Sequence, residues 1–472
     1  MLSAMGYATI IIILALLLTN RVTAVVALAG VPVVTALLAG FSIGEVGEFI
    51  GAGLGSVVGV TTMFVFAIVY FGLMRDAGLF DPIIGRIVGW AGNAPVTIAV
   101  ATTALACVAH LDGAGATTFL ITIPAMLPLY DRLGMSRLTL SVCVGMGAGV
   151  MNIMPWGGPT ARAATTTGID ANDLWVPLIP SQLVGIVGAL AIAWYLGRRE
   201  HRRLGLGADM TAPNQTPAMS LTGGGSGTAV TSGPAAGDAS SDDQRGVEPR
   251  DPLELSDEEQ ELRRPRLFWF NAALTVLVLA ALIAGFAPPE MIFLVGVVVA
   301  LVVNYPGLRR QTTRIEAHAT GAMLMATTLL AAGAFLGILG ESGMIDAMAS
   351  SAAGVVPSAV GPALPLIIGV LGVPLSLLFG PDAYYFGVMP VLTALGEQYG
   401  VPAEAIAQAS MMGQETVGFP ISPLTGSFYL LVGLAGVDIG RHIRALFGWA
   451  WLLSLLMLAT AFITTAIPVW VS

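Results

Sequence analysis

Apolar runs of roughly 17 to 25 residues recur along the chain, and this length is what an α-helix needs to cross a bilayer. The 472 residues are 56% hydrophobic and only 10% charged. An ordinary soluble domain carries about 25% charged residues. The sequence therefore predicts an all-α polytopic membrane protein, with the lipid bilayer as its surroundings.

The first apolar run, MLSAMGYATIIIILALLLTNR, has no basic residue ahead of it and no small-residue cleavage site. These features indicate a retained helix with its N-terminus outside the cell, not a cleaved signal peptide. The two cysteines, Cys107 and Cys143, both lie inside apolar segments. A disulfide framework and a cysteine-rich metal site are thereby excluded.

The composition changes abruptly in the middle of the chain. Residues 205–262 are rich in Gly, Ser, Thr and Ala and then become acidic. Such a segment buries too little apolar surface to order itself, so we expect a disordered acidic linker. It separates a first membrane repeat (1–204) from a second (263–472). Residues 238–261 hold most of the net charge of −9, so the remainder is near neutral and no nucleic-acid partner is expected.

The two membrane parts are similar at a fixed offset. GLMRDAGLFD at 72–81 matches GILGESGMID at 337–346, which lies 265 residues on. PWGGPT at 155–160 matches PISPLT at 420–425, again 265 residues on. Matches in the same order along both parts indicate an internal repeat.

Each repeat is expected to hold three spanning helices, a re-entrant hairpin, a helix broken near its middle and a final helix. In the first repeat these lie near 5–19, 23–40, 60–75, 96–130 (hairpin), 137–168 (broken) and 175–196. In the second they lie near 267–286, 288–304, 321–340, 362–399 (hairpin), 403–436 (broken) and 446–469. This gives about ten spanning helices and two hairpins.

Arginine alone carries the positive-inside signal, because the chain contains no lysine. With the linker in the cytoplasm, every arginine except Arg162 falls on the cytoplasmic side, and both termini lie outside. These cytoplasmic arginines outside the linker are Arg21, Arg75, Arg86, Arg132, Arg137, Arg198, Arg199, Arg202, Arg203, Arg263, Arg264, Arg266, Arg309, Arg310, Arg314, Arg441 and Arg444. The localisation expected is the plasma membrane, with multiple passes.

The hairpins decide how the repeats are related. If they do not cross, the chain crosses the membrane five times between Asp81 and Asp346, and the repeats are inverted. If 96–110 and 362–379 were full spans instead, the repeats would be parallel. The runs that follow them, 119–130 and 386–399, are too short to span, which favours the inverted arrangement. Inverted repeats with broken helices are typical of secondary transporters, whose substrates bind near the midplane.

Four interruptions are expected to converge there: a first tip (110–118, HLDGAGATT), a first break (152–160, NIMPWGGPT), a second tip (379–385, FGPDAYY) and a second break (419–427, FPISPLTGS). Free N–H groups at broken helices suit an anionic ligand, and glycines let the backbone approach it. The substrate-binding residues predicted from these segments are Asp112, Gly113, Gly115, Thr117, Thr118, Asn152, Gly157, Gly158, Pro159, Thr160, Asp382, Ser422, Pro423, Thr425 and Gly426.

Ionisable residues within these segments are expensive in a membrane and therefore point to function. Asp112 and Asp382 are oxygen donors of the kind that Mg²⁺ or Ca²⁺ prefers. His110 and Glu415 are candidates for proton coupling. Arg162, just after the first break, is a candidate for charge pairing, either with a substrate carboxylate or with a protein acid.

Structural explanations stand beside these functional ones. A single Pro-Gly interruption is often only a kink, although two at equivalent positions favour a site. Asp112 and Asp382 also suit the role of helix caps, His110 that of a hydrogen-bond donor at a helix end, and Glu415 that of a satisfied structural acid. Asp170 and Asp438 follow the breaks at loop positions and are expected to be caps.

At these segments the sequence resembles the citrate–divalent-metal–proton symporter family (CitMHS) of the ion transporter superfamily. The resemblance is carried by HLDGAGATTFLITIPAMLPLYDRLGM, NIMPWGGPTARAAT, LFGPDAYYFGVMP and GQETVGFPISPLTGSFYLLVGLAGVDIG. It implies a carrier of citrate in complex with a divalent metal (Mg or Ca), driven by protons, with no permanently bound cofactor. It also implies inverted repeats, two re-entrant hairpins, a homodimeric scaffold and an elevator-type moving core. Where the family pattern is DGDG, this chain has Asp112, Gly113, Ala114 and Gly115.

Citrate³⁻ with one divalent cation carries a net charge of −1, which suits helix N-termini combined with Asp112 and Asp382. The alternative is a carrier of another small carboxylate or oxyanion, such as a dicarboxylate, gluconate or arsenite, on the same fold. An intramembrane metalloprotease would show H-E-x-x-H, which this chain lacks, so we expect no enzyme. A channel fits paired broken helices less well than alternating access does.

Overall fold

The computed structural model describes residues 1–19, 21–205, 257–354, 357 and 360–470. Every regular element in these residues is a helix, as the sequence predicts. Among them, six helical segments are long and apolar enough to cross a membrane: Ile43–Asp76, Pro95–Asp112, Ala171–Arg203, Gln260–Ile283, Leu308–Glu341 and Ile439–Ile463. Shorter apolar helices of 10–17 residues accompany them.

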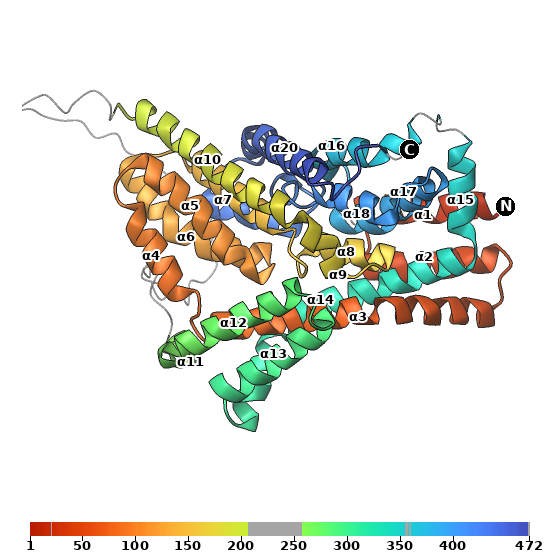
Figure 1. Ribbon diagram of the computed structural model, residues 1–472, viewed down its shortest axis with the longest axis horizontal. Helices are drawn as coiled ribbons and strands as arrows, with labels where there is room; N and C mark the ends of the chain where they lie inside the picture. The colour runs from red at the N-terminus through yellow and green to blue at the C-terminus, as the bar shows by residue number, and fades with distance from the viewer. Residues whose placement is uncertain (20, 206–256, 355–356, 358–359, 471–472) are drawn as a thin grey trace, which may run out of the picture.

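The helices follow the same order in both membrane parts (Figure 1). The first part contains α1 (Leu2–Leu18), α2 (Ala24–Leu38), α3 (Ile43–Asp76), α4 (Asp81–Ala91), α5 (Pro95–Ala109), α6 (Gly115–Leu133), α7 (Arg137–Met151), α8 (Gly158–Thr167), α9 (Ala171–Trp175) and α10 (Ile179–Arg203). The second contains α12 (Phe268–Ile283), α13 (Pro289–Asn304), α14 (Leu308–Glu341), α15 (Met344–Ala353), α16 (Leu364–Ser376), α17 (Met389–Gln398), α18 (Ala403–Met411), α19 (Gly426–Ala435) and α20 (Ile439–Ile463).

Between the two parts, residues 206–256 lie outside the described residues, so the disordered linker stays a prediction for them. Residues Asp257–Leu262, at the end of the expected linker, form the short helix α11.

The third helix of each part is longer than the sequence reading expected. Instead of 60–75 and 321–340, α3 and α14 each span 34 residues, which is about 51 Å of helix. At the start of α3, Ser42 and Glu45 form a capping box: the Ser42 hydroxyl accepts from the Glu45 N–H at 3.2 Å, and the Glu45 carboxylate accepts from the Ser42 N–H at 2.8 Å. Such a helix exceeds the roughly 30 Å hydrocarbon core, so it must tilt or project from it.

Helices α3 and α14 pack against each other in opposite directions. Gly53, near the start of α3, has no room for a Cβ because the backbone of Gly333 and Gly337 lies against it. Gly72, near the end of α3, faces the ring of His318, near the start of α14. Small residues thus let the two backbones approach closely over the length of the pair.

The segments expected to form hairpins and broken helices are interrupted helices, although Pro95–Asp112, within the first expected hairpin, is long and apolar enough to cross a membrane. Helix α5 leads through a short 3₁₀ turn (His110–Asp112) into α6, which packs back against α5. Helix α16 leads into a π-helical segment, Ala383–Val388, and then α17. Residues 152–157 separate α7 from α8, and residues 412–425 separate α18 from α19. The segments 81–91 and 344–353, which the sequence reading left between elements, form α4 and α15.

Two predicted helix caps are confirmed. The Asp170 carboxylate accepts from the backbone N–H of Asn172 at 2.7 Å, at the start of α9. The Asp438 carboxylate accepts from the backbone N–H of Arg441 at 2.9 Å. Because Asp438 starts the last helix, α20 spans Ile439–Ile463 and not the expected 446–469. Helices α10 and α20, the final helices of the two parts, pack side by side (Figure 1).

Candidate functional site

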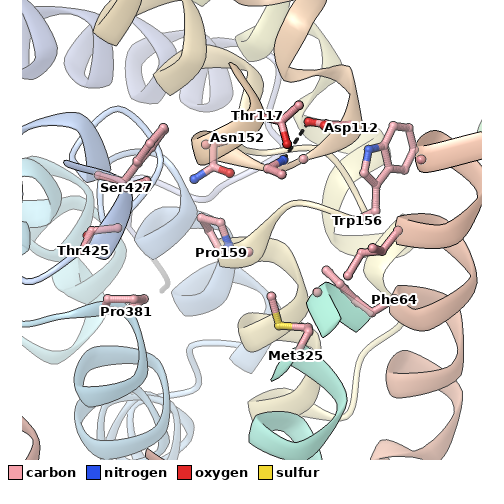
Figure 2. Close-up of a pocket in the computed structure, with 18 of the residues that line it drawn as sticks. Phe64, Asp112, Thr117, Asn152, Trp156, Pro159, Met325, Pro381, Thr425 and Ser427 are labelled. Atoms are coloured by element: carbon pink, nitrogen blue, oxygen red, sulfur yellow. Dashed lines mark hydrogen bonds between the residues drawn. The ribbon is translucent and has the colours of Figure 1, made fainter. Parts of the chain in front are cut away.

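A cavity of about 430 Å³ lies where both membrane parts meet. Its wall includes the first tip, both broken helices and one residue of the second tip, Pro381, together with the inner faces of α3 and α14. Figure 2 shows residues of both parts, such as Thr117 and Pro381, around this one space. The convergence of the interruptions therefore produces a site that neither part forms alone.

Three helices begin at the wall of this cavity. Helix α6 begins at Gly115 and α8 begins at Gly158, and both of these residues line the cavity. Helix α19 begins at Gly426, between the lining residues Thr425 and Ser427. The first N–H groups of a helix lack intrahelical acceptors and carry partial positive charge. The cavity therefore favours an anionic ligand.

Asp112 holds the first tip in shape and also faces the cavity. One carboxylate oxygen accepts from the backbone N–H of Ala114 at 2.9 Å, and the other lies 3.4 Å from the Arg75 guanidinium. Arg75 also donates to the Thr117 hydroxyl at 3.1 Å. Gly113 adopts a left-handed conformation (φ +73°), and a Cβ there would lie 3.0 Å from the Trp156 carbonyl oxygen. The prediction that Asp112 caps the following helix is wrong, because its bond goes to Ala114, the residue before α6, and no side chain among the described residues caps that helix.

A buried chain of hydrogen bonds connects the first tip to the second broken helix. The Asn152 amide donates to the Glu415 carbonyl oxygen at 2.7 Å, which turns its own oxygen toward His110. His110 Nε2 lies 3.2 Å from that oxygen, so the hydrogen-bond pattern places a proton on Nε2. His110 Nδ1 lies 2.7 Å from the Thr118 hydroxyl. His110 is fully buried and contacts two residues of the cavity wall: Asn152 through the hydrogen bond, and Phe419 through ring stacking with centroids 5.6 Å apart.

Glu415 is a buried acid at the cavity wall, with 2% of its surface exposed. One carboxyl oxygen accepts from the Thr425 hydroxyl at 2.9 Å, and the other has no hydrogen-bond partner among the described residues. The backbone of Glu415 has φ +55°, which is uncommon for a residue other than glycine and concentrates at functional sites. Within the described part of the chain, Glu415 therefore has one unpartnered oxygen atom that is buried in the wall of the cavity.

Arg162 pairs with a protein acid. Its Nε lies 2.7 Å from Asp382, and its Nη1 donates to the Gly158 carbonyl oxygen at 3.1 Å. Arg162 lines the cavity, whereas Asp382 lines a separate, smaller cavity of about 220 Å³ beside the α1–α2 connection. Asp112 and Asp382 consequently do not line the same cavity.

The predicted site residues, including those described above, divide into two groups. Ten predicted residues line the cavity: Asp112, Gly113, Gly115, Thr117, Asn152, Gly158, Pro159, Arg162, Glu415 and Thr425. Eight lie outside its lining: His110, Thr118, Gly157, Thr160, Asp382, Ser422, Pro423 and Gly426. Within the second group, the Thr160 hydroxyl donates to the Ile153 carbonyl oxygen at 2.7 Å. The Ser422 hydroxyl is buried and has no hydrogen-bond partner among the described residues.

Several lining residues were not predicted. Arg75 and His318 come from α3 and α14, and Trp156 comes from the first break. Trp156 stacks on Phe71 with ring centroids 4.8 Å apart and donates its indole N–H to the Leu111 carbonyl oxygen at 2.8 Å. The charge of Arg75 inside the repeated segment GLMRDAGLFD was a usable signal, but the sequence analysis used Arg75 only as a marker of orientation. Among the described residues, no group of three or more His, Cys, Asp or Glu side chains is arranged to hold a metal ion.

This arrangement of interrupted helices around one cavity defines a membrane transporter. Solved structures have the same fold. The YdaH transporter of Alcanivorax borkumensis superposes with a TM-score of 0.57 at 15% identity, covering 91% of each chain. MtrF of Neisseria gonorrhoeae superposes with a TM-score of 0.51 at 14% identity, covering 89% of this chain and 83% of that one. These likenesses concern the fold alone.

The sequence comparisons define the family. A family described as "Citrate transporter" matches residues 4–413. A citrate transporter of Bacillus subtilis (strain 168) is 40% identical over 95% of this chain and 96% of its own length. The Mg(2+)/citrate complex secondary transporter of the same organism is 36% identical over 99% of this chain and 100% of its own. The chain belongs to the citrate transporter family. It is a multi-pass membrane transporter and not an enzyme, as the sequence predicts.

Proposed function

We propose that this protein imports citrate as a complex with one divalent cation, Mg²⁺ or Ca²⁺, together with protons. The observation that carries the proposal is the mixed charge of the cavity. Three helix N-termini, Arg75 and Arg162 attract an anion, while Asp112 and Glu415 supply oxygen atoms on the same wall. A free trianion would be repelled by the Asp112 carboxylate, whereas a complex of net charge −1 suits both signs.

The relatives support the same substrate. One relative with full-length similarity is named for the Mg(2+)/citrate complex. The cavity volume of about 430 Å³ lies within the range of small-molecule sites. In our proposal citrate supplies most of the metal ligands, and Asp112 adds a carboxylate from the protein. Asp382 is the second candidate ligand, and it joins the site only if its pair with Arg162 opens.

For proton coupling we propose Glu415 as the proton carrier, with His110 in a supporting role. Glu415 lines the cavity and has an unpartnered, buried carboxyl oxygen among the described residues, where a proton can bind. A buried carboxyl group in a membrane favours its neutral form, so binding a proton removes an expensive charge before the site moves. Asn152 links His110 to the backbone of Glu415 and so connects the two candidates.

We further propose that the two membrane parts are inverted repeats. Helices α3 and α14 begin and end 265 residues apart, so residue 53 corresponds to 318 and residue 72 corresponds to 337. Gly53 packs on Gly337, and Gly72 packs on His318. Moving each residue of one contact to its equivalent in the other part gives the other contact. A two-fold axis between antiparallel, equivalent helices produces this symmetry.

The tips, by contrast, make unequal contacts with this α3–α14 pair. Arg75, at the end of α3, contacts the first tip. The equivalent residue of α14 is Gly340, and a Cβ added there would meet open space. The second tip instead shares a small cavity with Leu17, Leu18, Val22, Thr23 and Ala24. In the orientation given by the arginines, Arg75 and the α1–α2 connection both lie on the cytoplasmic side. We therefore propose an elevator-type carrier whose core occupies its cytoplasm-facing position here.

The remaining parts of the proposal follow from the same orientation and from the family resemblance. Both termini lie outside the plasma membrane, and the segment between the repeats lies in the cytoplasm. The carrier works as a homodimer, with the α3–α14 pair in the stationary scaffold.

Uptake of labelled citrate into proteoliposomes with an inward proton gradient tests the function. We expect uptake only when a divalent cation is present, loss of uptake with a chelator, and dissipation of the proton gradient. Uptake that a chelator leaves unchanged would favour a carrier of free carboxylates. Absence of citrate uptake under all conditions would refute the substrate.

A further inference from the structure

We propose that a second cavity, between α7, α10 and α20, binds the phosphate head group of an anionic membrane lipid. The cavity has a volume of about 600 Å³ and shares no lining residue with the transport site. The three helices pack against one another in pairs, so the cavity is a fixed gap between them and not a surface depression on one helix. Nothing in the proposed transport cycle uses it.

The cavity has an excess of positive charge. Three arginines line it, Arg199, Arg203 and Arg444, against one acid, Glu200. Glu200 pairs with Arg203 at 2.8 Å and accepts from the Thr139 hydroxyl at 2.9 Å. Among the described residues, Arg199 and Arg444 have no acidic partner, and Arg444 donates only to the backbone of its own helix. Two guanidinium groups are thus left for a ligand.

The rest of the wall distinguishes a lipid from a soluble anion. Leu138, Val142, Leu196 and Trp449 give the cavity an apolar side next to its arginines. Trp449 lies 5.7 Å from the ring of Tyr195, and aromatic pairs of this kind are typical of the membrane interface. A head group bound by the arginines can therefore place its acyl chains along an apolar wall, which a free phosphate ion does not need.

The position along the helices agrees with this ligand. Arg199 and Arg203 lie in the last turns of α10, and Arg444 lies in the second turn of α20. These helix ends are where basic residues gather in the sequence, at the cytoplasmic side of the proposed orientation. Basic pockets between membrane helices at this depth bind anionic head groups. Guanidinium groups suit phosphate because they offer two parallel N–H donors.

The test uses the full-length protein and a matched pair of double variants. Arg199→Gln with Arg444→Gln removes the two free arginines of the cavity. Arg202→Gln with Arg441→Gln removes the same charge from the same helix ends, at residues that do not line the cavity. Binding of phosphatidylglycerol and of phosphatidylcholine to detergent-solubilised protein is measured by native mass spectrometry, with inorganic phosphate as a third ligand.

We expect phosphatidylglycerol to bind the unmodified protein more tightly than phosphatidylcholine does. The cavity variant should lose on the order of 30-fold in affinity for phosphatidylglycerol, because it lacks two basic groups that each attract an anionic head group. The control variant should lose less than about threefold. A charge-conserving variant, Arg199→Lys with Arg444→Lys, should retain most of the binding and guards against misfolding as the cause.

Equal losses in the cavity and control variants would overturn the proposal, because they would mean unspecific attraction to a basic surface. Binding of inorganic phosphate as tight as that of phosphatidylglycerol would overturn the choice of a lipid. Equal binding of both lipids would overturn the role of the arginines.

Discussion

Replacing Arg75 by glutamine tests the proposed position of the moving core. Arg75 belongs to α3, in the proposed scaffold, and contacts Asp112 and Thr117 of the first tip. If the core moves away from this end of α3, these contacts break. They then stabilise only the cytoplasm-facing state, and Arg75→Gln should shift the equilibrium toward the outward-facing state.

The size of this shift follows from two contacts. The ion pair between Arg75 and Asp112 is 3.4 Å long, and the Arg75 side chain is 33% exposed, so solvent screening limits the pair to about 1 kcal/mol or less. The hydrogen bond to the Thr117 hydroxyl contributes about 0.5–1.5 kcal/mol. The sum of about 0.5–2.5 kcal/mol corresponds to a change of roughly 2- to 60-fold in the equilibrium constant.

Cysteine cross-linking measures the shift. Leu18→Cys and Pro381→Cys place thiols on two sides of the small cavity between the α1–α2 connection and the second tip. The two native cysteines are buried, so they compete little for the reagent. Arg75→Gln should lower the cross-linked fraction in proteoliposomes, and the exposed Arg86→Gln should leave it unchanged. A cross-linked fraction that is unchanged or higher in Arg75→Gln would refute the proposal that Arg75 stabilises the cytoplasm-facing state.

Three further substitutions test the site and the fold. Glu415→Gln keeps an acceptor for its hydroxyl partner but cannot bind a proton, so citrate uptake driven by a pH gradient should fall at least about tenfold; undiminished proton-driven uptake would remove Glu415 from coupling. Gly53→Val should destabilise the protein by about 1–3 kcal/mol, because its side chain meets the Gly333 backbone. Gly51→Val, with open space at its Cβ, is the matched control in thermal unfolding, and equal stabilities would contradict the α3–α14 packing. Asn152→Asp loses the donor to the Glu415 carbonyl oxygen, at about 1–3 kcal/mol for the unpaired buried group; thermal unfolding and uptake that match the unmodified protein would contradict the bridging role.

The interruptions of the membrane helices could be predicted because clusters of proline and glycine disfavour a helix, although Pro32 and Pro374 lie inside α2 and α16. The first tip and the first break therefore appear close to where the sequence reading expected them. The lengths of α3 and α14 could not be predicted in the same way, because residues 44–59 are rich in glycine and residues 308–320 are polar and charged, so neither stretch resembles an apolar spanning run. In the folded chain some of these glycines, such as Gly53, are contact points between helices and not helix ends.

The composition of the site was predictable only in part. Residues inside the interrupted segments, such as Asn152 and Thr425, line the cavity because those segments converge there. Arg75 was missed because its contribution depends on how α3 packs against the first tip, which no local pattern encodes. Asp382 occupies an equivalent interruption but is turned toward Arg162. Pairing between distant side chains decides such cases, and one sequence does not reveal it.

Simultaneous measurement of Mg²⁺ and citrate entry into the same proteoliposomes tests whether the protein carries citrate as a complex with the cation. An internal Mg²⁺ indicator and labelled citrate give the ratio of the two fluxes. We expect Mg²⁺ and citrate to enter in a ratio of one to one. Asp112→Asn should lower both fluxes in parallel by on the order of 10- to 100-fold. Citrate entry without Mg²⁺ or any other divalent cation would contradict transport of the complex.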